Sequence, residues 1–190
     1  RAGELLSEYD APEHRTYPER TCYLGAVASI LAKIDRVGYR DRIRGLGDAM
    51  LDDPDAGDCC RLTVHLSRAS DASRRHDYDE AQRLLDAADA FVERDGSGPE
   101  SLAHARFRLD LARTDLDSAA ARLERIEAER LRPGLSAREL RTRLAERKLL
   151  RCELATAQGV SDRALVYVEA ALWRAPVICG APRVALELLD

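Results

Sequence analysis

Apolar residues recur every three or four positions along most of this chain, which places them on one side of an α-helix. Leu24, Ile30 and Ile34 illustrate the spacing. The pattern breaks at turn residues, most clearly in 95–99 (DGSGP), and Ser136 with Glu139 is a capping-box pattern that opens a helix. We predict eight helices, at about 19–37, 40–51, 57–74, 78–94, 100–113, 117–131, 137–157 and 162–174.

The predicted helices form pairs, and the pairs repeat. Three six-residue stretches that lead into the second helix of a pair align with one another: 76–81 (HDYDEA), 114–119 (TDLDSA) and 159–164 (GVSDRA). The alanine that ends each stretch advances from 81 to 119 and then to 164, intervals of 38 and 45 residues. A first pair marked at Ile43 adds another interval of 38. Such self-similarity is typical of stacked helical hairpins.

The stretch 145–176 resembles a tetratricopeptide repeat, because small Cys152, turn Gly159, Ala164, Ala171 and closing Pro176 stand where that family has such residues. Residues 62–93 are similar, whereas 100–131 carry a bulky Phe107 at a small-residue position. The period is longer than the family's usual one of about 34 residues. The resemblance implies an all-α fold, a right-handed solenoid of about four antiparallel helix pairs. Its concave face, lined by the first helix of each pair, would bind peptide or protein segments.

The chain divides into three parts. Residues 1–18 are expected to be a link or the remnant of a helix, 19–176 the tetratricopeptide-like array, and 177–190 the truncated start of a further helix. A free solenoid needs polar caps, whereas 184–189 (VALELL) is largely apolar. We therefore expect an excised part of a larger, bacterial-type cytoplasmic protein.

Composition limits the classes of partner that the chain is expected to bind. The 190 residues carry 30 Lys and Arg against 34 Asp and Glu, a net charge of −4, so no bulk field draws the chain to nucleic acid or to a membrane surface. No apolar run approaches the length of about 20 residues that spans a bilayer. The five cysteines are an odd number in helical contexts, which favours free thiols in a reducing cytoplasm.

Motifs for catalysis or cofactor binding are missing. The stretch 96–98 (GSG) lacks the Lys-Ser/Thr of a phosphate-binding loop and is expected to be a hinge. Cys59, Cys60, His65 and His76 are the one Cys/His cluster, but adjacent residues on a helix diverge by about 100°, so we expect no metal site. Carboxylate pairs fall at helix ends, where they cap. We expect neither a cofactor nor enzymatic activity.

The resemblance also implies which residues line the groove. They mix small polar, aliphatic and charged side chains of both signs: Thr63, Leu66, Ser70, Ser73 and Arg74 on helix 57–74; Ser101, His104, Arg108 and Leu111 on helix 100–113; Glu146, Leu149, Glu153 and Thr156 on helix 137–157.

Arg143, Arg147 and Arg151 form a ladder of like charges at every fourth residue of helix 137–157. Like charges at this spacing destabilise an isolated helix, so acidic groups should lie opposite. Either helix 117–131 supplies them through Glu124, Glu127 or Glu129, or an acidic partner segment does.

These observations favour a non-catalytic protein-binding scaffold or sensor segment. Two alternatives stay open. The chain could be a homo-oligomerisation module, for instance a homodimer through its ends, where Leu172 and Trp173 would form an exposed edge. It could also be an all-α enzyme that uses acidic, His and Arg groups in the groove.

Overall fold

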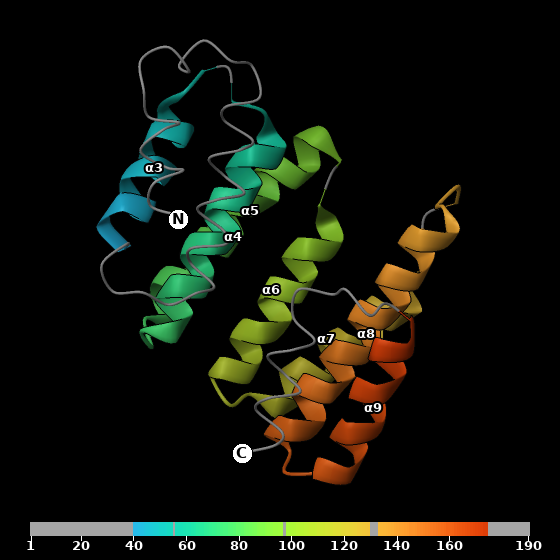
Figure 1. Cartoon of the computed structure of the whole chain (residues 1–190). Helices are drawn as coiled ribbons and strands as arrows, with labels where there is room; N and C mark the ends of the chain where they lie inside the picture. Colours follow the sequence, from blue (N-terminus) through green and yellow to red (C-terminus); the bar gives the residue numbers. More distant parts are fainter. Residues whose placement is uncertain (1–39, 55, 97, 130–132, 175–190) are drawn as a thin grey trace. The chain divides into compact units, whose positions relative to one another are not determined.

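The computed structural model describes residues 40–54, 56–96, 98–129 and 133–174 (Figure 1). Within these ranges the chain forms seven α-helices and no strand, so the prediction of an all-α fold is confirmed. The helices are α3 (Arg40–Asp52), α4 (Asp58–Arg74), α5 (Tyr78–Asp95), α6 (Pro99–Ala112), α7 (Leu116–Ala128), α8 (Ala137–Ala157) and α9 (Ser161–Arg174).

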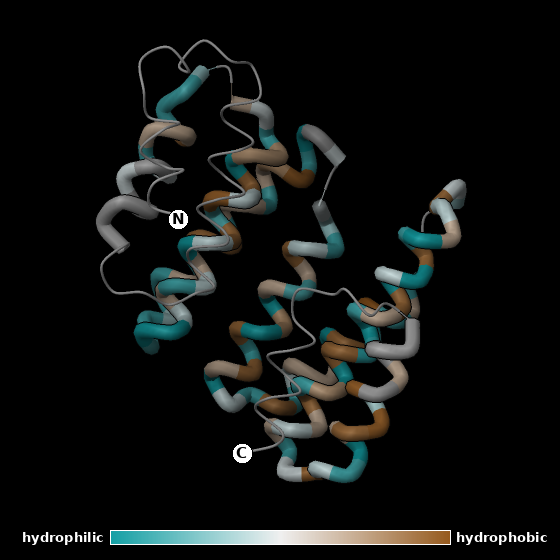
Figure 2. The backbone as a smooth tube through the Cα atoms, viewed as in Figure 1, coloured by the Kyte–Doolittle hydropathy of each residue, from teal (hydrophilic) through white to brown (hydrophobic). Residues whose placement is uncertain are grey.

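These bounds agree with the predicted ones to within one residue except at the end of α7. We predicted that this helix continues to 131, but Ala128 is its last residue, and the backbone of Glu129 is extended with φ −64° and ψ 126°. The predicted helix 19–37 and the segment 177–190 lie outside the described residues. In Figure 2 hydrophilic and hydrophobic residues alternate along each helix, as expected for helices with one buried side.

The chain divides into two compact units, Arg1–Ala105 and Arg106–Asp190. In the first unit α4 packs against α5, and the buried residues are mostly small: Ala69, Ala72, Ala81 and Ala88, with Leu85. Small side chains let two helix backbones approach closely. The start of α4 also meets the end of α5, because Arg94 donates two hydrogen bonds of 2.9 Å to the carboxylate of Asp58.

Helix α3 packs against α4 in the same unit. Arg68 of α4 pairs with Asp48 of α3 at 2.5 Å. A Cβ atom built on Gly47 would lie 3.1 Å from a methyl of Val64, so the missing side chain lets the two helices come together. The small residue at 47 thus fixes where α3 crosses α4.

The second unit is built around α8 and α9. Cys152 and Ala155 of α8 pack with Ala164 and Val168 of α9, and Tyr167 lies against this cluster. Helix α7 contacts α8 and buries Ala119, Leu123 and Ile126. At the start of α8 the predicted capping box is present, since Ser136 accepts from the N–H of Glu139 and the Glu139 carboxylate accepts from the N–H of Ser136.

The three aligned six-residue stretches form the same turn. Its first residue has positive φ: 61° at His76, 59° at Thr114 and 75° at Gly159. In each turn this residue donates its N–H to the carbonyl three positions back, and the next residue donates to the carbonyl five positions back. This is the Schellman pattern that ends helices. The alanine that closes each stretch is buried, with exposed fractions of 1%, 0% and 0% at Ala81, Ala119 and Ala164.

Candidate functional site

Two predicted groove residues meet across α6 and α8 in the second unit. The guanidinium of Arg108 on α6 donates hydrogen bonds of 2.9 and 3.0 Å to the two carboxylate oxygens of Glu153 on α8. The Arg108 side chain is 56% exposed and that of Glu153 is 20% exposed. The contact joins two helices that are separated in the sequence by α7.

More predicted residues extend this charged surface along α8. Glu146 contributes to the negative field at the Arg108 guanidinium. Arg143 lies 3.5 Å from the Glu146 carboxylate, one turn further back on the same helix. We call Arg108, Arg143, Glu146 and Glu153 the α6–α8 charged face. It presents both signs of charge within about three turns of α8, so it can recognise polar and charged groups of either sign.

The remainder of the arginine ladder faces α7. Arg151 binds both carboxylate oxygens of Glu127, and Tyr167 of α9 lies with its ring centroid 5.7 Å from the Arg151 guanidinium. These pairings raise the pKa of Arg151, first through the hydrogen bonds that it donates to Glu127. The sequence left two candidates for the acidic group opposite Arg151, a glutamate of the neighbouring helix or a partner segment. In the structure the neighbouring helix provides it through Glu127.

Arg147 binds backbone rather than a carboxylate. It donates hydrogen bonds of 3.1 and 3.0 Å to the carbonyls of Glu127 and Glu129 at the end of α7. Carbonyls of a last helical turn lack intrahelical partners, so this guanidinium satisfies two of them. Arg147 and Arg151 therefore hold α7 to α8.

Two predicted groove residues are corrected by the structure. Leu149 is only 4% exposed and His104 only 9% exposed, so both side chains lie in the interior and offer a partner almost no surface. The assignment was wrong because the side of a helix that faces outward depends on its rotation, and one residue of error in register turns it by about 100°. Ser101 and Thr156 are exposed and Leu111 is half-buried.

The predicted residues of α4 belong to the first unit. Ser70 is exposed, whereas Thr63, Leu66, Ser73 and Arg74 are half-buried. Thr63 donates its hydroxyl to the carbonyl of Cys59 at 2.9 Å, and Arg74 lies 3.6 Å from Asp71 on its own helix. These contacts are local to α4, so they neither join the α4 residues to another helix nor define a pocket there.

The described residues hold no group of three or more His, Cys, Asp or Glu side chains positioned to bind a metal ion. His65 packs its ring 5.1 Å from that of Phe91 and contacts the carbonyl of Leu84 at 3.2 Å. Burial lowers the pKa of His65, and burial raises the pKa of the Cys152 thiol. Burial is the first cause of both shifts, as expected of groups packed between helices.

Sequence reasoning missed one buried ion pair. Arg122 of α7 donates a 2.6 Å hydrogen bond to Asp110 of α6, which is only 7% exposed. An aspartate between Leu109 and Leu111 was an available signal, since a carboxylate in an interior position needs a partner. It also missed Tyr167, whose contact with Arg151 depends on how α8 and α9 pack.

None of the helices in the described ranges combines the length and hydropathy that crossing a bilayer requires. Comparison with known proteins gives no relative: no family model, no curated protein and no solved structure matches this chain.

Proposed function

We propose that this chain is a non-catalytic scaffold or sensor segment of a larger cytoplasmic protein that binds a protein or peptide on the α6–α8 charged face. The proposed architecture is a tetratricopeptide-like right-handed solenoid of antiparallel helix pairs. The observation that carries the proposal is the two-pronged contact of Arg108 with Glu153. In a solenoid of hairpins the first helices of successive pairs are neighbours and line one face, and in the proposed solenoid α6 and α8 would be two such helices.

The composition of the face supports recognition of a polar segment. Arg108, Glu146 and Glu153 bring a guanidinium and two carboxylates close together, and the Arg108 side chain is 56% exposed. Charged groups in such an arrangement select partners and guide encounter more than they add affinity. A partner segment carrying a basic group toward the carboxylates and an acidic group toward Arg108 fits this face.

Site-specific photo-crosslinking tests the proposal. A photoreactive residue replaces Thr156, which is exposed and lies one turn beyond Glu153 on α8. The matched control replaces Glu124, which is exposed on α7. We expect crosslinks to one protein or peptide species from position 156 and none from position 124. Adding Glu153→Lys should weaken them, while circular dichroism shows that the variant stays helical.

Equal crosslinking from positions 156 and 124 would contradict a binding surface on the α6–α8 charged face. Crosslinks from position 156 to a second copy of the chain would instead favour self-association.

Self-association is the second candidate function, and exposed apolar residues on α9 favour it. Leu165 is 49% exposed and Val166 is 62% exposed, side by side near the start of the helix. Light scattering at micromolar concentration separates the candidates, because a scaffold should remain monomeric. If the chain is a dimer and Leu165→Lys makes it monomeric while Leu144→Lys on α8 does not, the dimer forms through α9.

A further inference from the structure

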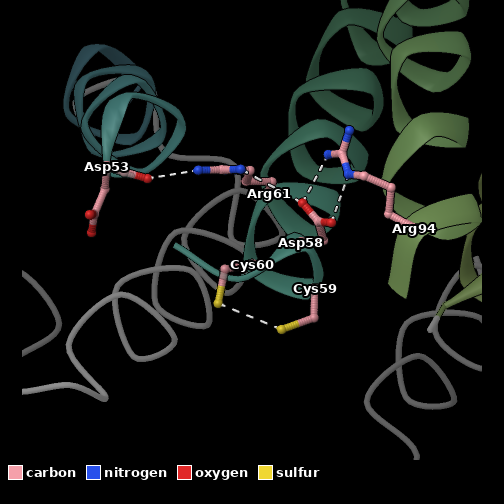
Figure 3. Close-up of polar contacts among 6 residues, drawn as sticks. All are labelled: Asp53, Asp58, Cys59, Cys60, Arg61 and Arg94. Carbon is pink, nitrogen blue, oxygen red and sulfur yellow. Dashed lines mark hydrogen bonds and ion pairs between the residues drawn. The ribbon is translucent and has the colours of Figure 1, made fainter. Parts of the chain in front are cut away.

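Two cysteines at the start of α4 lie next to each other in sequence and in space. Cys59 is exposed, Cys60 is 6% exposed, and neither forms a disulfide. Their Sγ atoms are 3.9 Å apart, and Figure 3 shows both sulfurs turned to the same side of the chain. The sequence predicts divergent side chains here. The two sulfur atoms do not diverge, because rotation about the two Cα–Cβ bonds brings them together.

The separation suits a bridging atom better than a disulfide. A disulfide needs sulfurs about 2.0 Å apart on Cα atoms usually about 4.4–6.8 Å apart. Cα atoms joined by a trans peptide are only about 3.8 Å apart, so adjacent cysteines form a strained ring. Two sulfurs bonded to one atom at about 2.3 Å, in contrast, are separated by about 3.3 Å at a pyramidal atom such as trivalent arsenic and by about 3.8 Å at a tetrahedral one. The Sγ atoms of Cys59 and Cys60, at 3.9 Å, lie much nearer to this range than to the length of a disulfide.

The pair offers two ligands and no third. In the part of the chain that the structure describes, no three metal-binding side chains converge. The neighbouring carboxylate of Asp58 is held by Arg94 at 2.9 Å on both oxygens. A closed structural zinc site takes four protein ligands, so this pair does not make one. The pair instead fits a thiophilic atom that binds two sulfurs and already carries its third substituent.

We propose that Cys59 and Cys60 form a dithiol binding site for soft, thiophilic centres of this kind, of which a monosubstituted trivalent arsenical is the simplest. Soft thiolate ligands select such centres. With an arsenical R–As=O, both thiols add their sulfurs to arsenic, two As–S bonds form, and the two thiol protons leave with the oxygen as one water. Arsenic stays trivalent, so no oxidant or reductant is required.

The fold holds this pair in place from both sides (Figure 3). Asp58 is bound by Arg94 at the end of α5, and Arg61 donates a 2.8 Å hydrogen bond to the carbonyl of Asp53 at the end of α3. In the unfolded chain the same two cysteines lose their fixed spacing. A ligand that binds the folded chain better than the unfolded chain raises the melting temperature.

The probe is phenylarsine oxide, added to the reduced full chain and followed by intact mass spectrometry and thermal unfolding. We expect one adduct per chain, reversed by a dithiol but not by a monothiol, and a higher melting temperature. Cys59→Ser and Cys60→Ser should each abolish the adduct, whereas the matched control Cys152→Ala should retain it. Because Cys59 is exposed, Cys59→Ser keeps the test valid even if Cys60→Ser unfolds the chain.

Three results would overturn the proposal: no adduct on the reduced chain, an adduct that survives in a folded Cys59→Ser variant, or a melting temperature lowered by the probe. The last would mean that the probe binds the unfolded chain better and that the folded geometry does not favour the site.

Discussion

The turn between α6 and α7 and the turn between α8 and α9 share one backbone geometry but are built from opposite residues. In the first, Thr114 takes the positive φ of 59°, and Asp115 caps α7 by accepting from the N–H of Ser118 at 3.1 Å. In the second, Gly159 takes the positive φ of 75°, and Val160 stands at the position of Asp115 with no side-chain oxygen to offer.

Each turn therefore has one of the two local stabilising residues and lacks the other. Glycine adopts positive φ without steric cost, whereas a β-branched residue is strained there. An N-cap aspartate satisfies a free N–H group, and valine cannot. What the turns share is the buried alanine four residues after the capping position, Ala119 and Ala164, both 0% exposed. A small, buried side chain at this position, rather than the local turn residues, is what the two turns have in common.

The largest expected effect comes from enlarging these two buried alanines. Ala119→Leu and Ala164→Leu should each lower the free energy of unfolding by about 1–3 kcal/mol, because added methyl groups in a packed interior force neighbours apart. Chemical denaturation measures the loss. Ala121→Leu, at an exposed position of α7, is the matched control and should change stability little. If all three variants behave alike, the two alanine positions are not tightly packed.

Substitutions at the two positive-φ positions should change the stability of the folded chain in opposite directions. Gly159→Ala should cost about 1 kcal/mol although open space surrounds the position, since the cost is conformational. Thr114→Gly should gain about 1 kcal/mol by removing strain. Thermal unfolding should show a lower melting temperature for Gly159→Ala and a higher one for Thr114→Gly. A loss of stability in Thr114→Gly would mean that its 2.6 Å hydroxyl contact with the Arg113 carbonyl outweighs the strain.

Adding the N-cap that α9 lacks should change stability by a smaller amount. Val160→Asp gives α9 the capping residue that α7 has in Asp115, and should raise stability by about 0.5–1 kcal/mol. Val160→Ala removes the same exposed side chain without adding an oxygen, so it is the control. Equal melting temperatures for the two variants would show that α9 does not use this cap.

The two turns should also differ in how their contribution to stability depends on pH. The Ser118 side chain and backbone N–H lower the pKa of Asp115 by hydrogen bonding to its carboxylate. The unfolded chain then binds this proton more readily, so the cap's contribution is complete above about pH 4 and is lost as the pH falls through the lowered value. Asp115→Asn keeps an oxygen acceptor without titrating.

Melting temperatures measured from pH 6 down to pH 2 should therefore fall less steeply in Asp115→Asn than in the wild type. Glu124→Gln, which removes an exposed carboxylate from the same helix, should follow the wild-type curve. Parallel curves for Asp115→Asn and the wild type would mean that the pKa of Asp115 is the same in the folded and the unfolded chain.

Helix bounds and turn register were predictable because both are set by short stretches of sequence. Gly159, the capping box at Ser136 and the buried alanines act within a few residues of where they stand. The end of α7 was not predictable in this way. The helix stops at Ala128 while Arg147, from another helix, binds the carbonyls of Glu127 and Glu129.

The candidate site was predictable only in part, because it depends on how each helix is rotated about its axis. Arg108 and Glu153 were both placed in the groove, and they do meet. Leu149 was placed there too, although it points into the interior. The sequence named Glu127 as one of three possible partners of the arginine ladder. That it pairs with Arg151 could be seen only from the packing of α7 against α8.

The contact of α6 with α8 carries the proposed function, and a charge-exchange cycle tests it most directly. Unfolding free energies are measured for Arg108→Glu, Glu153→Arg and the double variant. If the two helices are neighbours as described, each single change is destabilising and the double variant recovers about 0.5 kcal/mol or more through the reversed pair. If the double variant loses the sum of the two single losses, the residues do not interact, and the face built on them would have to be abandoned.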